Sequence, residues 1–191
     1  MISRTCAVFY RRSIALPLGA VLLPVALDSP VFAEQHDPEQ KRLGISRQAA
    51  MAAVVDVVAV RNLNDKDWLK RLEIEVENHS DKPIYHVQLY VLFPRAKLRR
   101  SDGVIGPIAI PLYYGRYDLM KEQNLAVSSD VPINPGQTYV FKVPEVAKKN
   151  IEGWVASGAI SEKSLDSILL RVYAVSFGDG TGLRAGGHAF P

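Results

Sequence analysis

The strictest pattern in this chain is a two-residue alternation over residues 71–77. Leu72, Ile74 and Val76 alternate there with charged side chains, three of them glutamates. Because successive side chains of a strand point to opposite faces, the pattern predicts a strand with one buried and one solvated face. Such half-buried strands are typical of antiparallel sheets. A mainly β fold is therefore the starting expectation.

Further strand patterns follow at short intervals, separated by turn residues. We expect strands over residues 54–60, 84–93, 108–113, 138–143 and 166–177. The first can begin with a helical turn, because it follows a run of alanines. The second should form a hairpin with the alternating strand through the turn at residues 78–83, and should end before Pro94, which cannot donate to a ladder.

The remaining periodic segment is helical. Residues 144–157 place apolar side chains near helical spacing between Pro144 and Gly158, which suit the start and the end of a helix. Several short strands with Pro and Gly turns and a single helix favour a sandwich. The predicted fold is mainly β, a single antiparallel Ig-like β-sandwich over residues 49–191, with one short helix before the last strand, 166–177.

The first 33 residues have the composition of a cleavable signal peptide. An apolar run over residues 13–27 ends shortly before a small-residue cleavage site at Ala33, and it follows Arg4, Arg11 and Arg12. The run is shorter than the roughly 20 residues that a bilayer-spanning helix needs, and prolines interrupt it. We expect export, with a periplasmic or extracellular destination and no membrane anchor after cleavage.

Two details refine the expected export. Arg11 and Arg12 weakly resemble a twin-arginine signal, but the general secretory route is favoured because signal peptides are arginine-rich in any case. The only cysteine, Cys6, precedes the apolar run, so it does not stand where a lipid-attachment cysteine would. Residues 34–48 are polar and without period, and they predict a flexible leader.

The charge of the chain argues against a nucleic-acid partner. The signal peptide takes three of the 23 basic and one of the 20 acidic residues, so the net charge falls from +3 to +1 on cleavage. Nucleic-acid and polybasic membrane binding both need a concentrated positive field. Neither partner is expected.

Motifs for catalysis are lacking in the sequence. The four histidines do not stand at metal-ligand spacing with another ligand: His36, His79, His86 and His188. His86 falls on a predicted strand, where a polar-face histidine is the ordinary interpretation. No nucleophile motif is present, and no cysteine remains after cleavage. We expect no enzyme, no catalytic residue, no metal and no cofactor, although a site assembled from distant residues stays open as an alternative.

Two polar clusters have both a functional and a structural interpretation. The loop from Asn62 to Asp67 is rich in oxygen ligands for Ca²⁺, but it lacks the glycine and the later bidentate glutamate of a strong calcium loop, so an ordinary Asn/Asp loop is favoured. The basic cluster can bind an anion, but it more often forms a solvated edge that discourages strand pairing: Arg95, Lys97, Arg99 and Arg100.

The candidate partner contacts are Tyr113, Tyr114, Arg116, Tyr117 and Asp179. Rigid tyrosines beside an arginine are typical of interface hot spots, although such a loop can equally fold back as cover for the core. Asp179 lies in FGDGTG, residues 177–182, where the glycines and the aspartate supply the chemistry of a tight turn without a ligand.

Four segments in order, VENHSDKPIYHVQL, YYGRYDL, DVPINPGQTYVFKVP and SFGDGTG, give the chain a resemblance to a family of uncharacterised secreted bacterial proteins. The resemblance covers about residues 67–181 and implies an Ig-like fold and export, without an activity. FGDGTG also resembles a string in the polycystic-kidney-disease type of Ig-like domain, but too few residues follow it for that domain's remaining strands.

Two classes of function follow from the sequence. The first is a non-enzymatic extracytoplasmic binding or structural module, whose partner is another envelope protein or a cell-surface polymer. The alternative is a subunit or small enzyme of the cell envelope with a site built from scattered polar residues.

Overall fold

Two β-sheets pack against each other in the computed structural model, which describes residues 42–99, 103, 105–121, 124–185 and 188–190. These residues belong to the unit His36–Pro191. The predicted signal peptide, residues 1–33, and residues 34–41 of the predicted leader lie outside the described residues. No helix among the described residues is long and apolar enough to cross a membrane.

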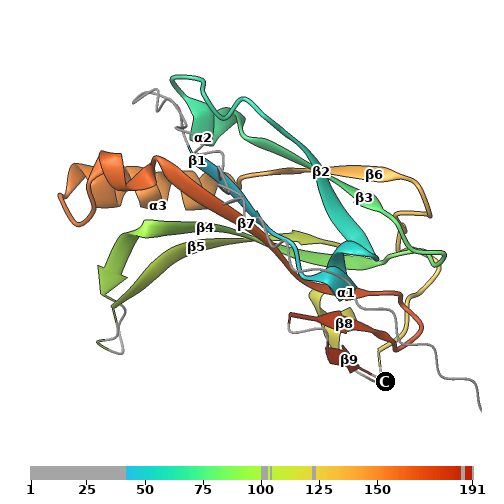
Figure 1. The fold of residues 1–191 in the computed structure, drawn as a ribbon. Coiled ribbons are helices and arrows are strands. Elements are labelled where there is room, and N and C mark those ends of the chain that lie inside the picture. Colours follow the sequence, from blue (N-terminus) through green and yellow to red (C-terminus); the bar gives the residue numbers. More distant parts are fainter. Residues whose placement is uncertain (1–41, 100–102, 104, 122–123, 186–187, 191) are drawn as a thin grey trace, which may run out of the picture. The chain divides into compact units, whose positions relative to one another are not determined.

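The large sheet is built around β7 (Figure 1). Its order is β5 (Ile105–Tyr114), β4 (His86–Arg99), β7 (Ser167–Ser176), β8 (Gly182–Arg184) and β9 (His188–Phe190). All of these pair antiparallel, and β1 (Arg42–Ser46) adds a parallel strand to the first half of β7. One side of β7 pairs with the long strand β4, and the other side pairs with two short strands, β1 and β8.

The small sheet has the antiparallel order β2 (Val55–Arg61), β3 (Glu73–Asn78) and β6 (Thr138–Lys142). The helical segments are α1 (Ala49–Ala52), α2 (Trp68–Arg71), α3 (Glu145–Ala156), and the 3₁₀ turns η1 (Tyr117–Met120) and η2 (Glu162–Leu165). Figure 1 shows α3 on the same side of β4 and β5 as the small sheet. Since β4 has 14 residues and β6 only five, α3 covers the inner face that the small sheet leaves open.

The core lies between the facing sides of the two sheets. Every second residue of β3, and of β4 from Val87 to Phe93, is buried there, together with Ile151 of α3. The fully buried side chains include Leu72, Ile74, Val76, Val87, Leu89, Val91 and Phe93. Burial of a large aliphatic or aromatic side chain contributes about 1.5–3 kcal/mol. The two-residue alternation of the sequence is therefore what places this core.

The predicted fold class is confirmed. The chain is mainly β, it forms two packed sheets with predominantly antiparallel pairing, and α3 precedes β7. This arrangement is consistent with the Ig-like class. The helical turn expected before the first strand is α1, and the alternating segment is β3.

The predicted hairpin between residues 72–77 and 84–93 is wrong. β3 belongs to the small sheet and β4 to the large one, so the segment between them crosses from one sheet to the other. Asn78, which is buried, fixes this crossover: its Nδ2 donates to the carbonyl oxygens of Lys82 and Ile133, both at 2.8 Å, and its Oδ1 accepts from Ser80 N and Oγ at 2.9 and 2.7 Å. Periodicity identifies strands but does not name their partners.

The prediction that the next strand ends before Pro94 is also wrong. β4 continues to Arg99, and its register with β5 shifts between Phe93 and Lys97. The missing N–H of Pro94 falls in this irregularity, where no ladder bond is required. β5 starts at Ile105, earlier than the expected Ile108, and tolerates its two prolines because it is an edge strand.

Two predictions at the ends of the domain need correction. The predicted leader, residues 34–48, contains β1, whose register pairs Arg42 with Ser167 and Ser46 with Arg171. The polar composition of this segment hid a strand whose partner lies more than 100 residues later. Residues 166–177 do not form the last strand, because the short β8 and β9 follow.

Candidate functional site

Four tyrosines gather on the outer face of the large sheet, which points away from the small sheet. They come from four elements: Tyr90 from β4, Tyr113 from β5, Tyr117 from η1 and Tyr173 from β7. The ring centroids of Tyr90 and Tyr173 lie 5.3 Å apart and those of Tyr113 and Tyr117 lie 5.8 Å apart, both edge to face. We call these four residues the tyrosine face.

The alternation of β4 places the polar side of the strand beneath this face. His86, Gln88 and Tyr90 occupy the positions between the core residues of the strand. Gln88 is almost fully buried, and its Nε2 donates to Tyr90 Oη at 2.8 Å. Burial raises the pKa of the Tyr90 hydroxyl, and the neighbouring tyrosines raise it further, so this group stays neutral and can donate a hydrogen bond.

His86 lies on this polar side of β4, and it is fully buried under Tyr113 and Tyr117. Its ring centroid lies 6.2 Å from that of Tyr113 and 6.1 Å from that of Tyr117. Neither ring nitrogen has a hydrogen-bond partner among the described residues. Burial lowers the pKa of His86, against an opposing effect of the backbone around Gly115 and of the Asp118 carboxylate. The imidazole is therefore neutral at pH 7.

His86 stands opposite Ser176 in the ladder of β4 and β7. A serine and a histidine in hydrogen-bond contact would suggest a nucleophile and its base. Ser176 is fully buried, however, and its Oγ accepts from the N–H of Gly178 at 3.2 Å. No hydrogen bond joins Oγ to the imidazole. Ser176 is therefore not an exposed nucleophile, and the pair has a structural position at the end of β7.

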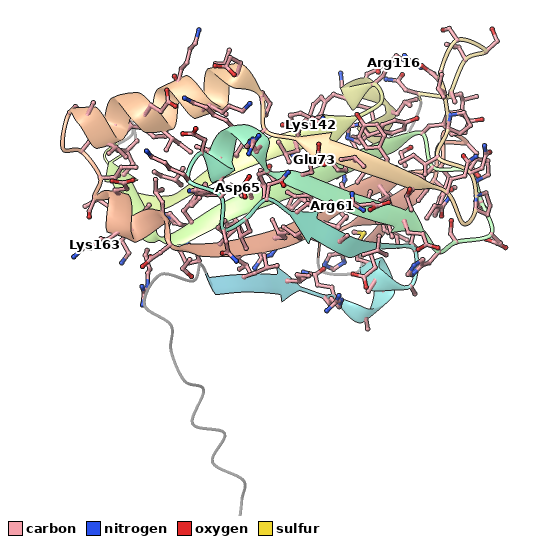
Figure 2. All side chains as sticks on the ribbon, turned by 90° about the horizontal axis from the view of Figure 1, so that it is seen from above. Arg61, Asp65, Glu73, Arg116, Lys142 and Lys163 are labelled. Atoms are coloured by element: carbon pink, nitrogen blue, oxygen red, sulfur yellow. The ribbon has the colours of Figure 1, made fainter. Side chains whose placement is uncertain are left out.

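Arg116 is held by the loop that follows η1. Its Nε and Nη2 donate to the two carboxylate oxygens of Asp130 at 2.8 and 2.9 Å, and further bonds reach Asp118 and the carbonyl oxygen of Leu125. The hydrogen bond from Arg116 lowers the pKa of Asp130, and the same contact raises that of Arg116. These bonds fix the shape of the loop. Figure 2 shows where Arg116 lies.

Of the candidate tyrosines, one covers the core and two are exposed to solvent. Tyr114 packs against Tyr139, with 4.5 Å between ring centroids, and its hydroxyl donates to the carbonyl oxygen of Val131 at 2.6 Å. It belongs to the border of the core. Tyr113 and Tyr117 are 46% and 63% exposed. Among the partner contacts predicted from the sequence, these two have aromatic rings exposed to solvent.

Asp179 stabilises the hairpin turn between β7 and β8. Its Oδ1 accepts from the N–H of Thr181 at 2.9 Å, and its Oδ2 pairs with Lys82 at 3.1 Å. The bonds from Thr181 and the nearby Lys82 lower the pKa of Asp179 to about 2. Gly178 and Gly180 have φ of 72° and 86°, as the turn chemistry predicts. These contacts account for FGDGTG as a turn.

Two polar residues of the oxygen-rich loop from Asn62 to Asp67 bond to other parts of the protein. Asn62 donates to the carbonyl oxygen of Arg71 at 2.8 Å, and Asp65 pairs with the Arg71 guanidinium at 2.9 Å. No group of three or more His, Cys, Asp or Glu side chains in the described part of the chain could hold a metal ion.

The predicted basic cluster lies on the far half of β4. Arg95 pairs with Asp166 at 3.5 Å, and Lys97 is exposed. Arg99 belongs to the strand, and Arg100 lies outside the described residues. A strand end with one paired arginine fits the interpretation of a solvated edge.

Two hollows away from the tyrosine face are lined by both acidic and basic residues. One, of about 380 Å³, lies at the small sheet, and its lining includes Glu73 and Lys142, which Figure 2 labels. Lys142 pairs there with Glu73 at 2.9 Å. The other, of about 290 Å³, separates α2 from α3, where Lys70 pairs with Glu152 at 3.3 Å. Each of these hollows has at least one acidic side chain among its described lining residues.

A third hollow adjoins the tyrosine face. It measures about 270 Å³, and it is lined by Gln88, Tyr117, Met120, Lys121, Tyr173 and Arg184. We call it the tyrosine groove. Its described lining residues carry two positive charges and no negative one. The other two hollows each have at least one acidic residue in their described lining.

Sequence reasoning missed most of this site. Tyr90, Tyr173 and Arg184 were not candidates, and Gln88 was seen only as a strand residue. One signal was present, since residues 86, 88 and 90 alternate polar side chains against Val87, Leu89 and Val91. The contribution of Arg184 carries no local signal, because β8 reaches β7 only through the turn at residues 177–181.

Comparison with known proteins gave no family: no family model, no curated protein and no solved structure matches the chain. The fold class therefore rests on the structure itself, and the resemblance to secreted bacterial proteins stays a prediction.

Proposed function

We propose that the protein is an exported, non-enzymatic binding module that uses the tyrosine face to hold a component of the cell envelope. The observation that carries the proposal is the position of Tyr113 and Tyr117. They lie on the outer face of the large sheet, exposed, while the core between the sheets is complete without them. Exposed, mutually packed tyrosine rings are typical of binding surfaces, because rigid aromatic area binds at a low cost in conformational entropy.

The rigidity of the surroundings supports the same proposal. Arg116 ties the loop after η1 to Asp130, and Tyr113 and Tyr117 pack on the buried His86. A ring that is already ordered in the free protein loses little freedom when a partner arrives. Export, which the composition of residues 1–33 predicts, would bring this face to envelope components.

The proposal can be tested by site-specific photocrosslinking in intact cells that produce the full chain. A benzophenone amino acid replaces Tyr113 or Tyr117, one at a time, and the same amino acid replaces Val146 as a control. Val146 is 71% exposed on α3, away from the tyrosine face. We expect one discrete adduct from the tyrosine positions and none from Val146.

The same experiment can contradict the proposal. If all three positions give the same adducts, or if the tyrosine positions give none while the protein is exported and folded, the tyrosine face is not a binding surface. A catalytic subunit of the envelope is the alternative, and a polar cleft with an activated nucleophile would be needed to support it.

A further inference from the structure

The tyrosine groove has the size for one unit of a longer ligand. Its volume of about 270 Å³ lies just below the roughly 300–1,000 Å³ of pockets that enclose a whole small molecule. One ring of a polymer can enter such a groove while the neighbouring units pass over the exposed tyrosines. The groove therefore suits a chain of small repeating units better than an isolated compound.

The aromatic wall of the groove is ordered before any ligand binds. Tyr173 packs edge to face on Tyr90, and Tyr117 packs edge to face on Tyr113. Tyr173 and Tyr117 remain 39% and 63% exposed. The face of an aromatic ring is slightly negative, and it attracts the slightly positive C–H groups on the flat side of a sugar ring.

The polar groups of the groove are also fixed. The hydrogen bond from Gln88 Nε2 to Tyr90 Oη sets the orientation of the amide, so the Gln88 oxygen is the acceptor for a ligand hydroxyl. Arg184 donates from Nη2 to the carbonyl oxygen of Met120 at 2.7 Å, and its guanidinium lies over the ring of Phe190, 5.1 Å from the centroid. Its other N–H groups can bind an anion in a defined direction.

Charge selects the kind of sugar. Lys121 and Arg184 line the groove, and none of its described lining residues is acidic. No ion pair joins either cation to a described residue. A carboxylate or phosphate on the ligand would supply the missing negative charge through hydrogen bonds stronger than neutral ones. A peptide ligand needs an apolar pocket or a free strand edge. Met120, itself nearly buried, is the only aliphatic side chain among the described residues that line the groove.

We propose that the tyrosine groove binds an acidic sugar unit of an envelope or extracellular polysaccharide, with Tyr117 and Tyr173 against the ring and with Lys121 and Arg184 on its negative group. This inference rests on the proposed function, of which it names the ligand class. Binding should weaken with salt, because the charged contact lies at the surface.

Calorimetric titration of the mature protein with defined oligosaccharides tests the inference. The probes are a galacturonic acid hexamer, its methyl ester, which keeps the rings and removes the charges, and a mannose 6-phosphate oligosaccharide, which distinguishes phosphate from carboxylate. We expect at least one acidic probe to bind at least about tenfold more tightly than the methyl ester, a difference of about 1.4 kcal/mol. Tyr117→Leu and Arg184→Gln should each weaken that binding at least about tenfold.

Lys163→Gln serves as the charge control, because Lys163 lies in η2, away from the tyrosine face (Figure 2). It should bind like the wild type, and all variants should melt as single folded species. Equal binding of acid and ester, equal loss in Lys163→Gln, or no binding of either acidic probe would overturn the inference. If, in the last case, photocrosslinking from Tyr117 still gives a discrete protein adduct, the proposed function stands and its ligand is a protein.

Discussion

Asn78 joins the two sheets, and its replacement should be among the most destabilising single changes outside the apolar core. Its side chain makes four hydrogen bonds, two to the backbone carbonyls of Lys82 and Ile133 and two from Ser80. Each such bond contributes about 0.5–1.5 kcal/mol net, and a buried carbonyl left without a partner costs about 1–3 kcal/mol. We expect Asn78→Ala to lower the free energy of unfolding by about 3 kcal/mol.

This loss can be measured by urea unfolding, followed by tryptophan fluorescence and extrapolated linearly to water. For a domain of about 150 residues, 1 kcal/mol shifts the melting temperature by about 2–4 °C, so a fall of about 6–12 °C is expected. Asn134→Ala is the matched control, because Asn134 is exposed and, among the described residues, its side chain bonds only to Gln137. It should cost less than about 0.5 kcal/mol. A loss below about 1 kcal/mol at Asn78 would refute the account of the crossover.

Three further outcomes follow from single contacts. In the unfolded chain, His86 takes up a proton below about pH 6.5, whereas burial in the folded protein lowers its pKa and opposes protonation. The free energy of unfolding should therefore fall as the pH drops from 7 to 5. Urea titrations should show that His86→Leu flattens this dependence. Gly178→Ala should cost about 2–4 kcal/mol by thermal melting, because its Cβ would come within 2.6 Å of neighbouring side chains, whereas Gly136→Ala, at a similar φ of 73° in open space, should cost about 1–2 kcal/mol. Arg116→Lys cannot reproduce the paired bonds to Asp130, so limited proteolysis should cut the loop at residues 124–131 faster than in the wild type.

The strands were predictable because their signal is local. The alternation of Leu72, Ile74 and Val76 against charged residues requires only that one face be buried, and that face is the core. Pairing depends on residues far apart in the sequence, and two errors share this cause. Asn78 takes the chain to the other sheet instead of turning it back, and β1 finds its partner in β7.

The candidate site was predictable only where its residues are close together in the sequence. Tyr113 and Tyr117 stand in one short, conspicuous segment, whereas Tyr173 and Arg184 reach them only through the ladder from β4 through β7 to β8. Arg116 and Asp179 have the composition of contact residues, yet intramolecular hydrogen bonds take up their charged groups. Composition alone does not distinguish a charge that awaits a partner from one that has a partner within the fold.

The most direct test of the central claim is co-sedimentation of the purified mature protein with isolated envelopes of the cells that produce it. The double variant Tyr113→Ser, Tyr117→Ser is compared with Val58→Ser, Val146→Ser, which removes two comparably exposed apolar side chains elsewhere. We predict that the tyrosine variant needs at least about tenfold more protein for half-saturation, and that the valine variant binds like the wild type. Equal binding by all three proteins, each with an unchanged melting temperature, would contradict the account.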